Sequence, residues 1–175
     1  MLGAAPLPTS GWRPETYLSA RAATWAWSAE AVMKKSPYEE ALALVEAGGA
    51  AEAAYQLLTK ASEQGDHRAD YAIGTWYLHG FFLKKNVKKG TQLIKKAADN
   101  DVADAAFDMA VSYEKGVGVK KNPGIAAAYY LRALRCGDAS AAKELERMFY
   151  WGIGVVKNRR LANEFALFEP NRIVN

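Results

Sequence analysis

The sequence offers few residues that could support catalysis or metal binding. Of its 175 residues one is a cysteine, Cys136, and two are histidines, His67 and His79. A single cysteine excludes an internal disulfide and is typical of a reducing compartment. No paired-histidine spacing, CxxC or GxSxG motif occurs, and Cys136 precedes Gly137 at a predicted helix end, where no helix N-terminus lowers its pKa. We therefore expect no catalytic residue, no metal site, no cofactor, no small-molecule substrate and no enzymatic activity.

Long hydrophobic runs are also missing. No stretch approaches the roughly 18 apolar residues that a membrane-spanning helix needs. The first residues lack a basic segment and are interrupted by Pro6, Pro8 and Pro14, so the sequence does not predict a cleaved signal peptide. Half of the residues are hydrophobic and 24% are charged, which is ordinary for a globular chain. These features predict a soluble, cytoplasmic protein with one domain over residues 1–175.

A shift of 36 residues brings three segments into register, and these are residues 69–104, 105–140 and 141–175. The matching columns are Ala69, Ala105 and Ala141; Tyr77, Tyr113 and Phe149; Gly80, Gly116 and Gly152; Leu83, Val119 and Val155; and the pairs Lys85-Asn86, Lys121-Asn122 and Lys157-Asn158. A fixed period of this length predicts an α-solenoid, in which each unit buries its apolar face against its neighbours.

Each unit reads as two helices joined by a tight loop. The glycine column ends the first helix, since glycine tolerates the left-handed cap conformation. The asparagine column is placed to cap the second helix, and Pro123 fits its first position. The column of Leu83, Val119 and Val155 is expected to turn into the core. Small residues, Gly74 and Ala110, should let the second helix approach the first.

These columns resemble the Sel-1-like repeat, a relative of the tetratricopeptide repeat. The clearest match is AFDMAVSYEKGVGVKKNPGIAAAYYLRALRCG, residues 106–137, and an earlier half repeat at residues 50–68 matches the family's second helix. The resemblance implies an all-α fold, a right-handed α-α superhelix of 36-residue helix-turn-helix repeats. The sequence departs from the family pattern at Phe81-Phe82, which replace loop glycine and valine, and the third unit stops short.

Residues 14–47 do not match the repeat. Pro14-Glu15 and Ser36-Pro37 each resemble a helix start, and the second helix is expected to run to Glu46. A solenoid must cover its open end, and atypical terminal helices do this. We therefore interpret residues 14–47 as an N-terminal helical cap, which is dense in tryptophan with Trp25 and Trp27.

The first helices of this repeat type line the concave face of the superhelix. On them, positions 4, 8 and 11 of each unit lie beside the buried stripe and vary between units, as a binding surface on a repeat scaffold should. The predicted partner-binding residues are Trp76, His79, Asp108, Ser112, Lys115, Glu144, Met148 and Trp151. Tryptophans are frequent anchors in protein interfaces. The alternative is that Trp76 and Trp151 pack between adjacent units.

The charge is unevenly distributed along the chain. Residues 1–68 carry six basic and eight acidic residues, whereas residues 69–175 carry 17 and 11. Nine basic residues lie in or beside the predicted inter-helix loops and define a basic edge: Lys84, Lys85, Lys88, Lys89, Lys120, Lys121, Lys157, Arg159 and Arg160. This edge is interpreted as a solvated, solubilising surface or, alternatively, as a binding site for an acidic partner, an anionic surface or nucleic acid.

These observations favour a non-enzymatic protein-protein interaction module that holds a partner protein in its concave groove. The resemblance implies adaptor and scaffold roles in signalling or host interaction. It also implies, for bacterial members, immunity proteins that neutralise a secreted toxin, so a toxin domain is one expected partner. Nucleic acid is the less favoured partner because aromatic residues do not interleave with the lysines.

Overall fold

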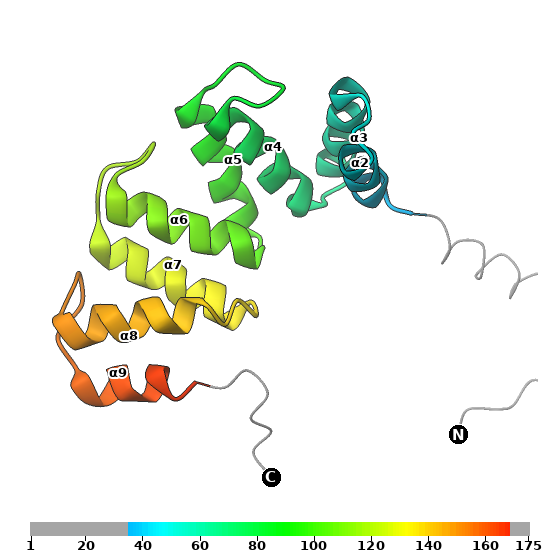
Figure 1. Cartoon of the computed structure of the whole chain (residues 1–175). Coiled ribbons are helices and arrows are strands. Elements are labelled where there is room, and N and C mark those ends of the chain that lie inside the picture. The colour runs from blue at the N-terminus through cyan, green and yellow to red at the C-terminus, as the bar shows by residue number, and fades with distance from the viewer. Residues whose placement is uncertain (1–34, 169–175) are drawn as a thin grey trace, which may run out of the picture. The chain divides into compact units, whose positions relative to one another are not determined.

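The computed structural model describes residues 35–168, and every regular element in that range is an α-helix (Figure 1). The chain divides into two units, residues 1–35 and 36–175, and the described helices belong to the second. In chain order they are α2 (Pro37–Glu46), α3 (Ala51–Glu63), α4 (His67–His79), α5 (Val87–Asp99), α6 (Ala103–Lys115), α7 (Pro123–Arg135), α8 (Ala141–Trp151) and α9 (Arg159–Ala166).

The helices form four consecutive pairs. In each pair the first helix packs on the second, and the second packs on the first helix of the next pair. Figure 1 shows α4 to α9 stacked side by side in chain order. Because contacts run principally between chain neighbours, this is the helical solenoid that the 36-residue period predicts.

The helix ends follow the repeated columns. The first helices end at glycines in the left-handed conformation, Gly80, Gly116 and Gly152, with φ of 75°, 80° and 76°. The second helices begin after asparagines whose side chains accept hydrogen bonds from backbone N–H groups of the first turn, namely Asn86, Asn122 and Asn158. Both predictions are confirmed, as is Pro123 at the first position of α7.

The helix expected from Ser36-Pro37 is also confirmed as α2. The Ser36 hydroxyl accepts a hydrogen bond from the backbone N–H of Glu39, and the Glu39 carboxylate accepts one from the backbone N–H of Ser36. This reciprocal capping fixes the start of the helix. Residues 14–34 of the predicted cap, which include Trp25 and Trp27, lie outside the described residues. The division between the two units, at Lys35 and Ser36, falls within the predicted cap of residues 14–47.

Small residues build the core of the solenoid. The repeated alanines Ala69, Ala105 and Ala141 are fully buried, and the loop residues Leu83, Val119 and Val155 pack against the two core clusters as expected. Helices α4 and α5 lie close together at two glycines. A Cβ added to Gly74 would lie 2.7 Å from Ile94, and one added to Gly90 would lie 2.7 Å from the Gly74 carbonyl oxygen.

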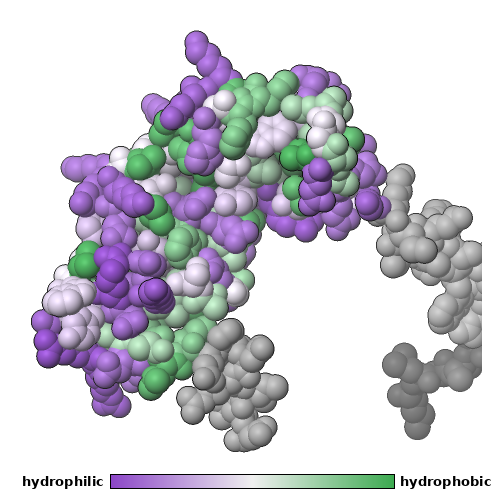
Figure 2. All heavy atoms as spheres, in the orientation of Figure 1, coloured by the Kyte–Doolittle hydropathy of each residue, from purple (hydrophilic) through white to green (hydrophobic). Residues whose placement is uncertain are grey.

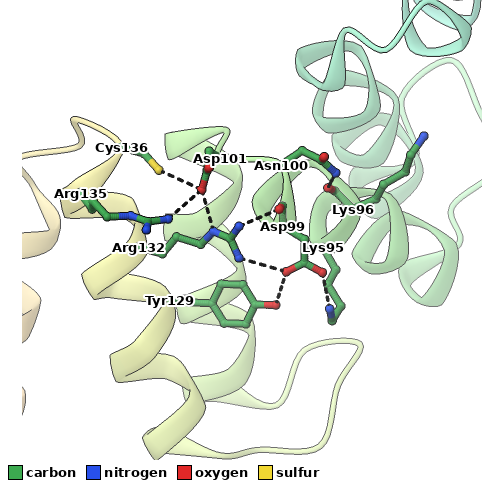
Figure 3. Close-up of polar contacts among 9 residues, drawn as sticks. All are labelled: Lys95, Lys96, Asp99, Asn100, Asp101, Tyr129, Arg132, Arg135 and Cys136. Atoms are coloured by element: carbon green, nitrogen blue, oxygen red, sulfur yellow. Dashed lines mark hydrogen bonds and ion pairs between the residues drawn. The ribbon is translucent and has the colours of Figure 1, made fainter.

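Polar contacts join the C-terminal ends of α5 and α7 (Figure 3). Asp101 has a φ of 62°, and its carboxylate accepts hydrogen bonds from Arg132 and Arg135, both at 3.0 Å. Asp99 accepts one from the Tyr129 hydroxyl at 3.0 Å and pairs with Lys95. The residues 36 before and after Asp101 are glycines with positive φ, so an aspartate takes the glycine position here and links consecutive second helices.

Candidate protein-interaction surface

The first helices α4, α6 and α8 carry the predicted partner-binding residues. At their C-terminal ends His79, Lys115 and Trp151 are exposed, and the Trp151 residue is 65% accessible. Asp108 and Glu144, earlier on α6 and α8, are half-buried. We call this surface the first-helix face. It consists of His79, Asp108, Lys115, Glu144 and Trp151 together with the half-buried Thr75, Val111 and Arg147.

Two of the predicted contacts are wrong. Met148 is fully buried and Ser112 is 8% exposed, so neither side chain can serve as a surface anchor. Both stand at position 8 of their units, seven residues after the buried alanines Ala141 and Ala105. Residues seven apart lie on the same side of an α-helix. Position 8 therefore belongs to the buried stripe, and the spacing alone already contained that signal.

Position 7 takes the place of position 8 on the first-helix face, and sequence reasoning missed it. Its residues Thr75, Val111 and Arg147 are half-buried. The Arg147 guanidinium donates to Glu114 on α6 at 2.7 Å and to Glu144 on α8 at 3.0 Å. Arg147 thus links the first helices of consecutive units. No local pattern indicated this contact, because Glu114 lies 33 residues away in the chain.

A second polar link crosses the same face one unit earlier. The Tyr71 hydroxyl on α4 donates a hydrogen bond to Asp108 on α6 at 3.1 Å. Burial raises the pKa of Asp108 and the nearby Asp104 carboxylate adds to this, although the hydrogen bond from Tyr71 opposes it. Burial also raises the pKa of Tyr71, so its hydroxyl stays protonated and remains a donor. Asp108 is therefore a partly desolvated carboxyl group on α6.

Trp151 borders a surface pocket that extends along α8. The pocket has a volume of about 370 Å³ and is lined by Lys143, Glu144, Glu146, Arg147, Tyr150 and Trp151. The Tyr150 ring meets the Trp151 indole edge to face, with centroids 4.8 Å apart. One large aromatic side chain thus stands beside charged residues of both signs.

Trp76 packs between consecutive helix pairs and is not freely exposed to solvent. Its ring lies 6.4 Å from the Tyr55 ring of α3 and 6.1 Å from the Phe82 ring of the α4–α5 loop. The two phenylalanines of that loop are exposed, Phe81 to 67% and Phe82 to 47%. They close one side of a second pocket of about 330 Å³ with Val45, Gly49, Ala51 and Trp76.

All nine residues of the predicted basic edge are exposed. Three of them contact neighbouring side chains. Lys89 donates to the Tyr77 hydroxyl at 2.7 Å, Arg159 lies over the Tyr150 ring, and Arg160 pairs with Glu164 at 3.6 Å.

Asp70 and Cys136 are ionisable residues that are at least partly buried, and neither belongs to a metal-binding cluster of the described residues. Within residues 35–168 no group of three or more His, Cys, Asp or Glu side chains is arranged to hold a metal ion. The buried Asp70 carboxylate accepts from Ser62 at 2.7 Å and Lys96 at 3.0 Å and pairs with His67 at 2.8 Å. Burial opposes ionisation of Asp70, yet these contacts outweigh it and lower its pKa. Burial raises the pKa of Cys136, which disfavours the reactive thiolate.

The described helices are too short and too polar for a membrane span: among residues 35–168 none meets the length and hydropathy that crossing a bilayer requires.

Several known proteins are similar to this chain. The crystal structure of a Sel1 repeat protein from Oxalobacter formigenes is 27% identical and has a TM-score of 0.68, covering 87% of this chain and 68% of that one. Helicobacter pylori cysteine rich protein B is also 27% identical, with a TM-score of 0.55 over 58% of this chain and 77% of that one.

A third structure shows the fold alone. It is a protective antigen of uropathogenic Escherichia coli that displays an SLR fold, 22% identical with a TM-score of 0.68, and it covers 74% of this chain and 28% of that one. No curated protein matches the sequence.

The Sel1 repeat pattern matches residues 50–66, 67–102, 103–138 and 141–167. The second and third of these segments begin where α4 and α6 begin, at His67 and Ala103. Because the matched segments together cover more than half of the sequence and the helix pairs stack as the repeat requires, this chain belongs to the Sel1 repeat family.

Proposed function

We propose that this chain binds a partner protein on its first-helix face, with Trp151 as the principal anchor. Sel1 repeat proteins are generally protein-protein interaction modules. The observation that carries the proposal is the 65% exposure of Trp151 beside a pocket on α8. Most of the other large side chains of α4, α6 and α8 are at least half-buried. The exposed indole of Trp151 is therefore the large apolar surface on these helices that a bound partner would cover.

The surroundings of Trp151 suit an anchor. Tryptophan contributes disproportionately to protein interfaces because it buries a large area while losing few rotatable bonds. The Tyr150 ring packs against the indole and restricts it before binding. Ordering that is already present in the free protein lowers the entropy lost on association.

The charged residues of the face are arranged to orient a partner. Asp108 and Glu144 are acidic, whereas Lys115 and Arg147 are basic, and they alternate along α6 and α8. Arg147 is held by Glu114 and Glu144. Mixed charges at the rim of an interface set orientation and partner choice more than affinity. We therefore assign affinity to Trp151 and specificity to Asp108, Lys115 and Glu144.

Affinity capture with the full chain as bait, followed by titration calorimetry on the purified partner, tests the proposal. Replacing Trp151 with alanine should weaken binding by about 30-fold, the effect of losing an interface hot spot of about 2 kcal/mol. Leu131→Ala is the matched control, because Leu131 is an exposed hydrophobic residue (43%) on the second helix α7. Equal binding by wild type and Trp151→Ala would contradict the proposal.

The partner's identity is a more specific proposal. A secreted toxin is the partner that the resemblance to bacterial immunity proteins suggests, and an adaptor role in signalling or host interaction is its alternative. Titration against the product of the neighbouring gene separates them. Sub-micromolar binding that also abolishes the activity of that product supports the immunity role, and its absence favours the adaptor.

A further inference from the structure

The loops between α4 and α5, α6 and α7, and α8 and α9 carry positive charge without internal compensation. The segments are residues 80–89, 116–122 and 152–160, and they contain the nine residues of the basic edge and no acidic residue. Six lysines make no ion pair or hydrogen bond with any described residue: Lys84, Lys85, Lys88, Lys120, Lys121 and Lys157. Accumulated like charge of this kind produces a positive surface potential.

The same three loops also present apolar side chains to solvent. Each loop turns one residue into the core, Leu83, Val119 or Val155. Beside these residues others point outward, with exposures of 67% for Phe81, 47% for Phe82, 40% for Val117 and 88% for Val156. Figure 2 shows hydrophobic and hydrophilic atoms intermingled along the margin where these loops lie. Each of the three loops therefore combines exposed apolar side chains with lysines that form no ion pair.

The opposite ends of the helices differ. Where α5 meets α6 and α7 meets α8, Asp101 holds Arg132 and Arg135, and Asp99 holds Lys95 (Figure 3). Arg132, Arg135 and Lys95 are thus neutralised by neighbouring carboxylates. The loop edge differs because its nine cations are concentrated in three segments that contain no acidic residue.

We propose that this loop edge docks the protein on an anionic lipid surface, with the apolar tips entering the headgroup region and the lysines contacting lipid phosphates and carboxylates. Small apolar insertions combined with basic side chains are what peripheral membrane attachment requires. Long lysine stems keep the charged amine among the headgroups while the chain's apolar part lies deeper. Figure 1 shows the α6–α7 and α8–α9 loops next to each other at the left margin of the helical array and the α4–α5 loop at its top, so the loops follow one another in chain order and neighbouring loops can contact one surface.

Two features favour lipid over the other polyanions. Seven of the nine cations are lysines, whereas precise pairing with carboxylates or phosphates of a folded partner favours the planar guanidinium of arginine. In two of the three loops the exposed apolar residues, Val117 and Val156, are aliphatic and offer no ring on which a nucleotide base can stack, so aromatic rings are confined to Phe81 and Phe82 of the first loop.

Co-sedimentation of the full chain with vesicles tests this proposal. The vesicles are phosphatidylcholine alone, or phosphatidylcholine with about 30% phosphatidylserine. We expect binding to the anionic vesicles only. The double variant Lys84→Glu/Lys120→Glu should bind at least about 25-fold more weakly, given about fivefold per lysine near a charged membrane. Phe81→Ser/Val156→Ser should bind about tenfold more weakly at unchanged charge.

Matched controls place the same changes elsewhere. Lys60→Glu/Lys143→Glu alters the net charge equally on exposed lysines outside the loop edge, and Leu42→Ser/Leu131→Ser removes exposed apolar side chains that lie outside these loops. Both should bind nearly as wild type does, and circular dichroism verifies that all four variants are folded. Equal losses in control and edge variants would overturn the proposal.

Three further results would also overturn it. They are no binding to anionic vesicles, full binding by Phe81→Ser/Val156→Ser, and an edge that binds polyglutamate or single-stranded oligonucleotide but no vesicle.

Discussion

The hydroxyl of Tyr71 on α4 donates a hydrogen bond to Asp108 on α6 across 3.1 Å and joins the first helices of consecutive repeats. One repeat later the corresponding link is ionic, from Arg147 on α8 to Glu114 on α6 at 2.7 Å. The proposed binding face is therefore fastened across repeat boundaries by two different polar contacts. A repeat array gains stability mainly from such nearest-neighbour interfaces.

Replacing Asp108 with asparagine should stabilise the protein at neutral pH. Burial raises the pKa of Asp108, so its charged form is disfavoured in the folded state, while the amide oxygen still accepts from Tyr71. A raised carboxyl pKa stabilises the fold fully only below the unfolded value of about 3.9 and loses this contribution as pH rises through the folded value. Urea unfolding should thus show a higher free energy of unfolding for Asp108→Asn than for wild type at pH 7, and this difference should vanish near pH 3. A destabilised variant at pH 7 would contradict this reasoning.

Replacing Asp70 with asparagine should have the opposite effect. Its buried carboxylate joins α3, α4 and α5 through Ser62, His67 and Lys96, and these contacts lower its pKa. We expect a loss of about 2 kcal/mol in the free energy of unfolding at pH 7. A lowered pKa contributes stability above the unfolded value of about 3.9, and this is lost as pH falls through the folded value.

The cost of Asp70→Asn should accordingly shrink when urea unfolding is repeated below pH 3. Asp104→Asn, on the exposed side of α6, is the control and should change little. A pH-independent cost for Asp70→Asn would show that the carboxylate charge is not its cause.

Gly74→Ala should destabilise the chain although alanine favours helices. The added Cβ would lie 2.7 Å from Ile94 Cγ1 and 3.0 Å from the Gly90 carbonyl oxygen. Overpacking costs about 1–3 kcal/mol and exceeds the helix-propensity gain of about 1 kcal/mol. Thermal unfolding should therefore show a lower Tm, whereas Thr75→Ala on the adjacent, half-buried position should leave the Tm nearly unchanged. A higher Tm for Gly74→Ala would show that α5 can move away without penalty.

Cys136 should react slowly with alkylating agents. Burial and then the neighbouring Asp101 carboxylate raise the pKa of its thiol, so little thiolate exists at neutral pH. The rate of iodoacetamide modification, followed against pH, should have its midpoint above that of the unfolded protein. Asp101→Asn should move the midpoint downward, and urea-unfolded protein serves as the reference. A midpoint in the folded protein at or below that of the urea-unfolded protein would contradict the assignment.

Local residue chemistry specifies the helix-pair units of the fold and their ends. Glycine at Gly116 and asparagine at Asn122 specify a helix end and a helix start through their own backbone and side-chain chemistry. The buried alanine at Ala105 marks the core face because residues spaced by whole helical turns share one side. These are local effects, so the helix pairs, the loop residues that turn into the core and the solenoid class could all be predicted.

The packing of neighbouring helices explains why the two predicted tryptophan anchors differ in exposure. Trp76 is covered because Tyr55 of the preceding pair and Phe82 of the next loop pack on it, whereas Trp151 at the end of α8 stays exposed. The contact between Arg147 and Glu114 depends on how consecutive pairs stack. Exposure and long-range pairing arise from the neighbours that packing brings together, and a position's own spacing does not specify those neighbours.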